Sequence, residues 1–164
     1  MFTALFIWLG AAQEASAVQV KSTLGDVPVS RAMMTQYETL SPLNSIKHVT
    51  DLIIAGSQQD FPVVERGHIV GVVTRSDVVR ALAERGGQGF VSGIMRRDFQ
   101  TLGATELLSA ASDKMQIGGL HTVPIVSDGQ LVGLLTLENI GEYLMIQSAL
   151  KVSPQYRREP EVAL

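Results

Sequence analysis

The 164-residue chain contains no cysteine, which excludes disulfide bonds and thiolate metal sites and is compatible with a reducing cytosol. An excess of positive charge is also absent. The 13 basic residues against 16 acidic residues leave a net charge of −3, which disfavours a large nucleic-acid interface. The 46% of hydrophobic and 18% of charged residues are the composition of a globular protein. The length suits one compact domain, or two half-sized ones that share a core.

The side chains that most catalytic sites need are scarce. The only histidines are His48, His68 and His121, and no two of them lie one helical turn apart. The sequence also offers no Ser-His-Asp combination that its fold would bring together. We therefore predict that the chain is not an enzyme and holds no metal ion.

The N-terminus is uncharged over residues 1–13 and strongly apolar over residues 2–12. Eleven helical residues rise about 16 Å, roughly half the thickness of the hydrocarbon core of a bilayer. A signal peptide with Ala15-Ser16-Ala17 as its cleavage site lacks the expected basic start, since the first basic residue is Lys21. A helix on a partner or membrane surface is a second interpretation. We favour a third, the end of a membrane span, followed by a short helix over residues 14–24.

The most informative feature is an internal repeat. Residues 29–82 align with residues 91–144 at a constant offset of 62, without a gap, and 14 of these 54 positions are identical. Because a small repeated unit usually buries its core against its copy, we expect two halves related by a pseudo-twofold axis. Polar positions kept in both copies would then face one another and form a ligand cleft.

Each copy predicts the order strand–helix–strand–strand–helix. An extended piece at residues 39–40, or 101–102, precedes the first helix, for which Ser41 is a candidate N-cap and Pro42 the first residue. Paired apolar runs around Arg66-Gly67 and around Asp128-Gly129 predict two β-hairpins. The apolar positions at helical spacing are Leu43, Ile46, Val49, Ile53, Val78, Val79, Ala81 and Leu82 in the first copy, and Leu108, Ala111, Met115, Ile140, Tyr143 and Leu144 in the second.

These patterns divide the chain into five parts. They are an apolar connector (1–26), a first repeat (27–85), a linker (86–90), a second repeat (91–150) and a loose polar tail (151–164). The linker contains Gly86-Gly87-Gln88-Gly89, which lacks the spacing of a phosphate-binding loop.

The sharpest local motif is Gly71-Val-Val-Thr74-Arg-Ser-Asp77, in which a strand end is followed by a threonine and, three residues later, an aspartate. Its copy ends in Thr136 and Asn139. The motif places a hydroxyl and a carboxylate beside the free amides of a helix N-terminus, which suits a phosphate and a ribose diol. The same residues are also a capping box, which needs no ligand.

The repeat carries the sequence h-P-V at its first hairpin strand and G-h-h-T-x-x-D from its second, where h is a hydrophobic residue. In these motifs it resembles a cystathionine-β-synthase (CBS) domain. Residues 27–150 resemble a tandem pair of such domains, often called a Bateman module. The resemblance implies an α/β fold and a ligand that contains adenosine, with ribose and phosphate held by Thr74 and Asp77. It places the base against Thr39, Leu40 and Phe61, and a basic phosphate partner at His121. The corresponding positions of the other half are Thr101, Val123, Thr136 and Asn139.

The chain departs from that family pattern at two positions. Asn139 replaces the second aspartate, and an amide lacks the charge that strengthens a hydrogen bond. Gln59 stands in the first repeat where the second has His121. We therefore expect one good site near Asp77 and a weakened or empty one near Asn139. Arg75, Arg96 and Arg97 are candidates for balancing phosphate charge, or are solvated surface residues.

Residues 4–14 and 138–150 resemble the C-terminal region of bacterial site-2-protease-type intramembrane zinc metalloproteases. In these proteases the last membrane helix leads into a cytosolic CBS pair, which would account for the apolar start. The resemblance implies a cytoplasmic location on the cytosolic face of the inner membrane, with attachment to a membrane domain through the N-terminus. The chain has no H-E-x-x-H motif and cannot cleave peptides by that mechanism.

Together these features predict a non-catalytic regulatory module. It would bind AMP, ADP, ATP or S-adenosylmethionine between two CBS repeats and regulate a membrane metalloprotease, and the family resemblance implies a homodimer. The alternative is a structural dimerisation module without a ligand, in which Thr74 and Asp77 only cap a helix.

Overall fold

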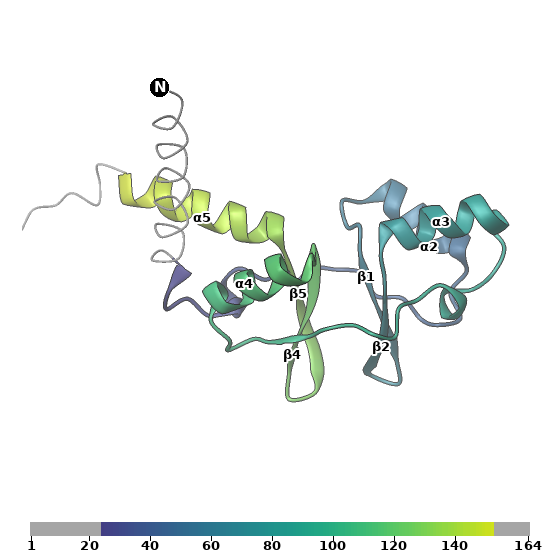
Figure 1. The fold of residues 1–164 in the computed structure, drawn as a ribbon, viewed down its shortest axis with the longest axis horizontal. Helices are drawn as coiled ribbons and strands as arrows, with labels where there is room; N and C mark the ends of the chain where they lie inside the picture. The colour runs from purple at the N-terminus through teal and green to yellow at the C-terminus, as the bar shows by residue number, and fades with distance from the viewer. Residues whose placement is uncertain (1–23, 153–164) are drawn as a thin grey trace, which may run out of the picture.

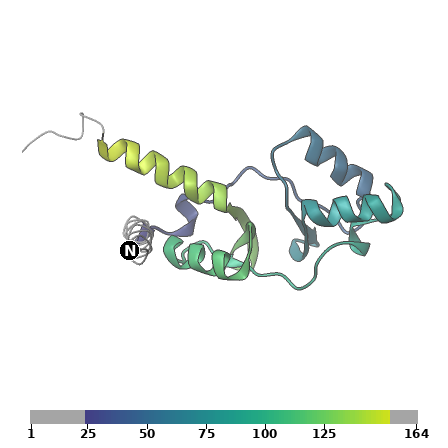
Figure 2. The same ribbon diagram turned by 45° about the horizontal axis from the view of Figure 1, so that its top comes forward.

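The computed structural model describes residues 24–152. These residues form two lobes, with the strands of each lobe toward the middle of the molecule and the helices toward its two ends (Figure 1). The view in Figure 2 shows the same separation of the two lobes. Most of the predicted connector (1–26) and of the predicted tail (151–164) lies outside the described residues.

The predicted order of elements is confirmed in the second copy and, from its first helix onward, in the first copy. The first repeat contains α2 (Ile46–Ala55), β1 (Phe61–Glu65), β2 (His68–Val73) and α3 (Arg75–Arg85). The second contains β3 (Leu102–Gly103), α4 (Leu108–Gly118), β4 (Thr122–Ser127), β5 (Gln130–Thr136) and α5 (Leu137–Val152). A single-turn 3₁₀ helix lies at the start of each repeat, η1 (Val29–Arg31) and η2 (Val91–Gly93).

Both predicted hairpins are present. Strands β1 and β2 pair in antiparallel fashion, as do β4 and β5, and β3 adds a parallel strand to the second pair. In the first repeat the strand that would match β3 is reduced to a single parallel bridge between Leu40 and Val63. The two turn residues have positive φ in each hairpin, 51° and 83° at Arg66-Gly67 and 52° and 76° at Asp128-Gly129. This left-handed pair is the two-residue turn that matches the twist of antiparallel strands.

The start of α2 differs from the sequence-based prediction. The N-cap is Ser45 and not Ser41, and its hydroxyl accepts a hydrogen bond from the amide of His48 at 3.1 Å. The earlier residues form a turn instead, because the side-chain oxygen of Asn44 accepts from the amide of Ser41 at 2.7 Å. Leu43 therefore does not join the apolar face of the helix and is 78% exposed.

The residues at the start of the first repeat pack on the second repeat. The η1 amide at Val29 donates to the carbonyl of Glu106 at 2.9 Å. Farther along, Met34 pairs with Leu134 of β5 through two backbone hydrogen bonds of 2.7 and 2.9 Å. Residues 24–34, here called the first crossing segment, therefore begin in the lobe of the second repeat before the chain crosses to the first (Figure 1).

The linker and the first residues of the second repeat make the reciprocal contacts. The amide of Val91 donates to the carbonyl of Asn44 at 2.8 Å, and Arg96 pairs with Val72 of β2 through backbone bonds of 2.9 and 3.0 Å. Each of these residues lies 62 positions from its counterpart in the other set. Residues 86–96, the second crossing segment, thus complete the lobe of the first repeat, and the two segments are exchanged across the pseudo-twofold axis.

The hydrophobic core follows this exchange. One cluster combines Leu24 and Val29 with buried side chains of the second repeat, including Leu108 and Met115. The other combines Val91 with buried side chains of the first repeat. Burying one valine or leucine side chain contributes about 1.5–3 kcal/mol. Each lobe therefore draws part of its stability from residues at or just before the start of the other repeat.

Two glycines make room for the crossing segments. A Cβ on Gly133 would lie 2.6 Å from the sulfur of Met33 and 3.0 Å from the carbonyl oxygen of Met34. A Cβ on Gly71 would lie 2.9 Å from the carbonyl oxygen of Arg96. Glycine therefore occurs at this position in both copies of the repeat because a larger side chain would collide with the crossing segment.

Within residues 24–152, no helix is both long enough and apolar enough to cross a membrane.

Replacing Gly133 with alanine is expected to lower the free energy of unfolding by about 1–3 kcal/mol, because the added methyl group overpacks against the first crossing segment. Urea denaturation measures this change. Gly71→Ala should be destabilising for the same reason. The control is Gly141→Ala in α5, where a Cβ meets no atom within 4 Å and alanine should stabilise the helix by about 0.5–1 kcal/mol. Equal effects at the three positions would contradict the close approach of the crossing segments.

Candidate ligand-binding cleft

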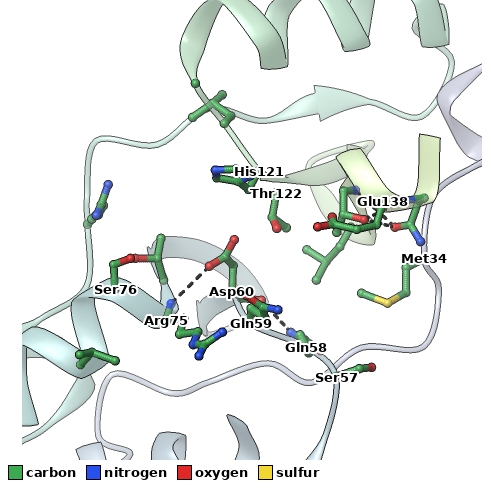
Figure 3. A pocket seen from close by; sticks show the side chains of 18 of the residues that line it. Met34, Ser57, Gln58, Gln59, Asp60, Arg75, Ser76, His121, Thr122 and Glu138 are labelled. Atoms are coloured by element: carbon green, nitrogen blue, oxygen red, sulfur yellow. Dashed lines mark hydrogen bonds between the residues drawn. The ribbon is translucent and has the colours of Figure 1, made fainter. Parts of the chain in front are cut away.

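A cleft of about 1070 Å³ lies between the two repeats (Figure 3). Matching elements of both repeats line it: the turn before β1 and the start of α3 on one side, and the turn before β4 and the start of α5 on the other. His121 and Thr122 of the second repeat lie opposite Gln59 and Asp60 of the first (Figure 3). The cleft therefore has two pseudo-equivalent halves, which we call the Asp77 half and the Asn139 half.

In the Asp77 half, Thr74 and Asp77 form the predicted capping box of α3. The amide of Asp77 donates to the Thr74 hydroxyl oxygen at 3.2 Å, and the amide of Thr74 donates to the Asp77 carboxylate at 3.1 Å. The hydroxyl of Thr74 also donates to that carboxylate, at 2.7 Å. The helix start thus holds both side chains at the edge of the cleft.

The carboxylate of Asp77 also forms an ion pair with Arg96 of the second crossing segment. The Nε of Arg96 donates to both carboxylate oxygens, at 3.1 and 2.9 Å, and Nη2 donates to Oδ1 at 2.8 Å. Nη2 of Arg80 lies 3.7 Å from Oδ1. The Asp77 side chain is only 5% exposed, whereas that of Arg96 is 51% exposed. The pair therefore joins a buried anion to a cation at the surface.

Opposing effects act on the pKa of Asp77. Burial by itself would raise it, but the hydrogen bonds from Arg96 and Thr74, together with the positive charge of Arg96, lower the pKa below its ordinary value. The pKa of Arg96 is raised, chiefly by the hydrogen bond to Asp77. Both groups are therefore charged at neutral pH.

The Asn139 half repeats the cap without the ion pair. The hydroxyl of Thr136 donates to the Asn139 side-chain oxygen at 2.8 Å, and the Asn139 amide donates to that hydroxyl at 3.0 Å. At the position 62 residues before Arg96 stands Met34, which also lines the cleft. Glu138 and Glu142 line this half, and Arg75 and Arg80 line the other. The two halves thus share a backbone arrangement and differ in charge.

The structure separates the predicted site residues into two groups. Thr74, Thr136, Asn139 and His121 line the cleft, and Asp77 joins them through its hydrogen bonds. The other five do not line it: Leu40, Phe61 and Val123 are buried in the cores, and Thr39 and Thr101 are exposed. Their roles toward a ligand stay predictions.

Sequence reasoning did not find the pairing of Arg96 with Asp77. In the sequence Arg96 is one of three candidate arginines, because nothing local connects it with a residue 19 positions earlier. A signal was nevertheless present in the repeat. In the repeat, Asp77 aligns with Asn139 and Arg96 aligns with Met34. The two charged residues therefore occur together in one half, and both are replaced by neutral residues in the other.

Comparison with known proteins decides the family. The CBS domain model matches residues 24–84 and again residues 91–146, which together are most of the chain. The chain belongs to the CBS domain family. The CBS domain-containing protein YhcV of Bacillus subtilis is 32% identical over 114 residues, which are 68% of this chain and 81% of YhcV.

Solved structures show the same CBS fold. The CBS domain pair of protein MJ0100, in complex with 5′-methylthioadenosine and S-adenosyl-L-methionine, is 26% identical with a TM-score of 0.66, over 72% of this chain and 99% of that one. The CBS domain of a bacterial CNNM/CorC family Mg²⁺ transporter, in complex with ATP, is 20% identical with a TM-score of 0.68, over 81% of this chain and 97% of that one.

Some curated relatives are much longer than this chain. It is 30% identical over 119 residues to the homoserine O-acetyltransferase of Methanohalophilus mahii, and it spans 24% of that protein's length. The matching part of such relatives is thus a CBS pair within a larger protein.

The ion pair predicts how stability depends on pH. Because the folded-state pKa of Asp77 is lowered, its ionised form stabilises the fold above the unfolded pKa of about 3.9. This stabilisation is lost as the pH falls through the lower folded pKa. Asp77→Asn keeps the cap and removes the charge, so it should destabilise the protein by about 1 kcal/mol near pH 6, a small value because Arg96 is half exposed. The difference should shrink toward pH 3.

Urea denaturation of both proteins from pH 3 to pH 7 tests this expectation. Asp51→Asn is the control, because it removes a carboxylate from an exposed i,i+4 pair with Lys47 and should change stability by no more than about 0.5 kcal/mol. A constant difference between wild type and Asp77→Asn over the whole range would show that the charge of Asp77 is not what stabilises the fold.

Proposed function

We propose that the chain is a non-catalytic regulatory module that binds an adenosine-containing ligand in the cleft between its CBS repeats. CBS modules are generally regulatory, and the solved pairs described above hold S-adenosylmethionine, 5′-methylthioadenosine or ATP. The observation that carries the proposal is that Thr74 lines the cleft at the N-terminus of α3, with the nearly buried Asp77 hydrogen-bonded to it.

The chemistry of this placement suits a nucleoside. A buried, ionised carboxylate accepts hydrogen bonds from a ribose diol, and such charge-assisted bonds are stronger than neutral ones. The backbone amides at the start of α3 and the nearby Arg75 and Arg80 favour negative charge. The Asn139 half offers the same geometry with an amide oxygen in place of the carboxylate, so we propose that it binds more weakly.

Regulation would act through the arrangement of the two repeats. A ligand shifts an equilibrium between two arrangements only by its differential affinity for them. Because the cleft is lined by both repeats, a ligand that contacts both sides responds to their relative position. We propose that this bias reaches an attached membrane domain, a metalloprotease being our candidate.

A structural dimerisation module is the second candidate. Several large apolar side chains on the helices are exposed, among them Ile54 on α2 at 78% and Ile117 on α4 at 89%. A homodimer would cover some of these side chains, and we propose that the module forms one. This function would need no ligand.

Thermal unfolding with AMP, ADP, ATP and S-adenosylmethionine tests the first proposal. A ligand at 100 times its dissociation constant adds about 2.7 kcal/mol, which raises Tm by roughly 5–10 °C for a domain of this size. Asp77→Ala should remove the part of the shift that comes from the Asp77 half, measured against the variant's own Tm. Ser45→Ala is the matched control. This substitution removes the N-cap of α2, which lies away from the cleft, and should lower the free energy of unfolding by about 0.5–2 kcal/mol. The ligand-induced shift in Tm should remain.

If none of the four ligands raises Tm, the ligand-binding proposal is wrong. Light scattering across a range of protein concentrations would then examine the dimerisation module directly. A monomer at every concentration would exclude that function as well.

A further inference from the structure

The carboxylate of Asp77 has no free position for a ribose. Its two oxygens offer about four lone-pair directions. The oxygen Oδ2 accepts hydrogen bonds from the amide and the hydroxyl of Thr74 and from Nε of Arg96. The oxygen Oδ1 accepts from Nε and Nη2 of Arg96. The Thr74 bonds belong to the helix cap and stay. A ribose hydroxyl can therefore donate to Asp77 only where Arg96 has moved away.

Arg96 is placed so that it can move. Its backbone is held by the paired hydrogen bonds to Val72, but its side chain is 51% exposed and lines the cleft. Arg96 is not a member of either core cluster. Swinging its guanidinium aside leaves a cation without its partner beside the cleft, and this loss has to be compensated by a second anion.

We propose that Arg96 is a ligand-displaceable counter-ion that makes the Asp77 half selective for phosphorylated adenosine ligands. This inference rests on the proposed function. The ribose takes the place of Arg96 on Asp77, and the released guanidinium binds a phosphate of the same ligand. One ion pair is then exchanged for another, whereas a ligand without phosphate breaks the pair and replaces nothing.

The Asn139 half has the opposite preference. Met34 stands where Arg96 stands in the other half, so no ion pair has to be broken there. Glu138 and Glu142 line this half together with His121, and the two carboxylates make it less favourable for a phosphate. Asp60 lines the Asp77 half, but three arginines, Arg75, Arg80 and Arg96, lie beside it. The Asn139 half therefore accepts an unphosphorylated adenosine ligand, neutral or cationic. The two halves of one cleft thus select unlike ligands through two pairs of substitutions in the repeat.

Titration calorimetry with AMP and with adenosine tests this inference on the intact chain, and binding that is lost in Asp77→Ala is assigned to the Asp77 half. In wild type, AMP should bind this half about tenfold more tightly than adenosine, the worth of one charge-assisted contact. Arg96→Met, which copies Met34, should weaken AMP binding and leave adenosine binding equal or stronger, so that the preference disappears.

Arg97→Met is the matched control, because Arg97 does not line the cleft and its guanidinium bonds the carbonyl of Ser92 at 3.3 Å. It should keep the preference for AMP. The double variant Met34→Arg with Asn139→Asp rebuilds the ion pair in the other half and should shift its preference toward AMP, although Glu138 and Glu142 remain there.

Two results would overturn the inference while the proposed function stands. These are equal affinities of AMP and adenosine for the Asp77 half of the wild type, or an equal loss of both in Arg96→Met. Binding of neither AMP nor adenosine would also overturn this inference. The proposed function would fall with it only if ADP, ATP and S-adenosylmethionine did not bind either.

Discussion

The reciprocal exchange of the two crossing segments is the constraint on which the rest of the structure depends. Residues 24–34 complete the core of the second repeat, and residues 86–96 complete that of the first. Neither lobe is whole without the segment that precedes the other repeat. The exchange also explains why Gly71 and Gly133 recur, since each lets a backbone pass where a Cβ would collide. Two small units that could not each bury a sufficient core are in this way joined into one cooperative structure.

The same exchange sets the chemistry of the cleft. The crossing segments carry Met34 and Arg96 to equivalent places on its wall, so a difference between two connecting segments becomes a difference between two binding surfaces. The pairing of Arg96 with Asp77 satisfies a buried carboxylate that would otherwise be costly. Asn139 needs no such partner, because an amide can be buried without a counter-charge. The Asp77 half thus combines an anion with a cation, and the Asn139 half has a neutral residue at both of the corresponding positions.

The T-x-x-D motif has a structural role and a proposed binding role in the same atoms. Thr74 and Asp77 satisfy free amides at the start of α3 whether or not a ligand is present. A helix cap therefore does not argue against a site, and a site does not follow from the cap. The observation that distinguishes the motif from an ordinary cap is its position at the edge of a cleft lined by both repeats.

Much of the fold was predictable from the sequence because its signals are local. The 62-residue repeat, the hairpins at Arg66-Gly67 and Asp128-Gly129, and the helix face of Leu108, Ala111 and Met115 each depend on neighbouring residues, and the structure confirms them. Other features were decided only by the tertiary structure. The N-cap at Ser45, the exchange of the crossing segments, and the ion pair between Asp77 and Arg96 depend on which distant backbone lies nearby. The sequence by itself determined the family and the repeated architecture. Only the packed chain decided which residues share a core and which charges meet in the cleft, because long-range contacts carry no local periodicity.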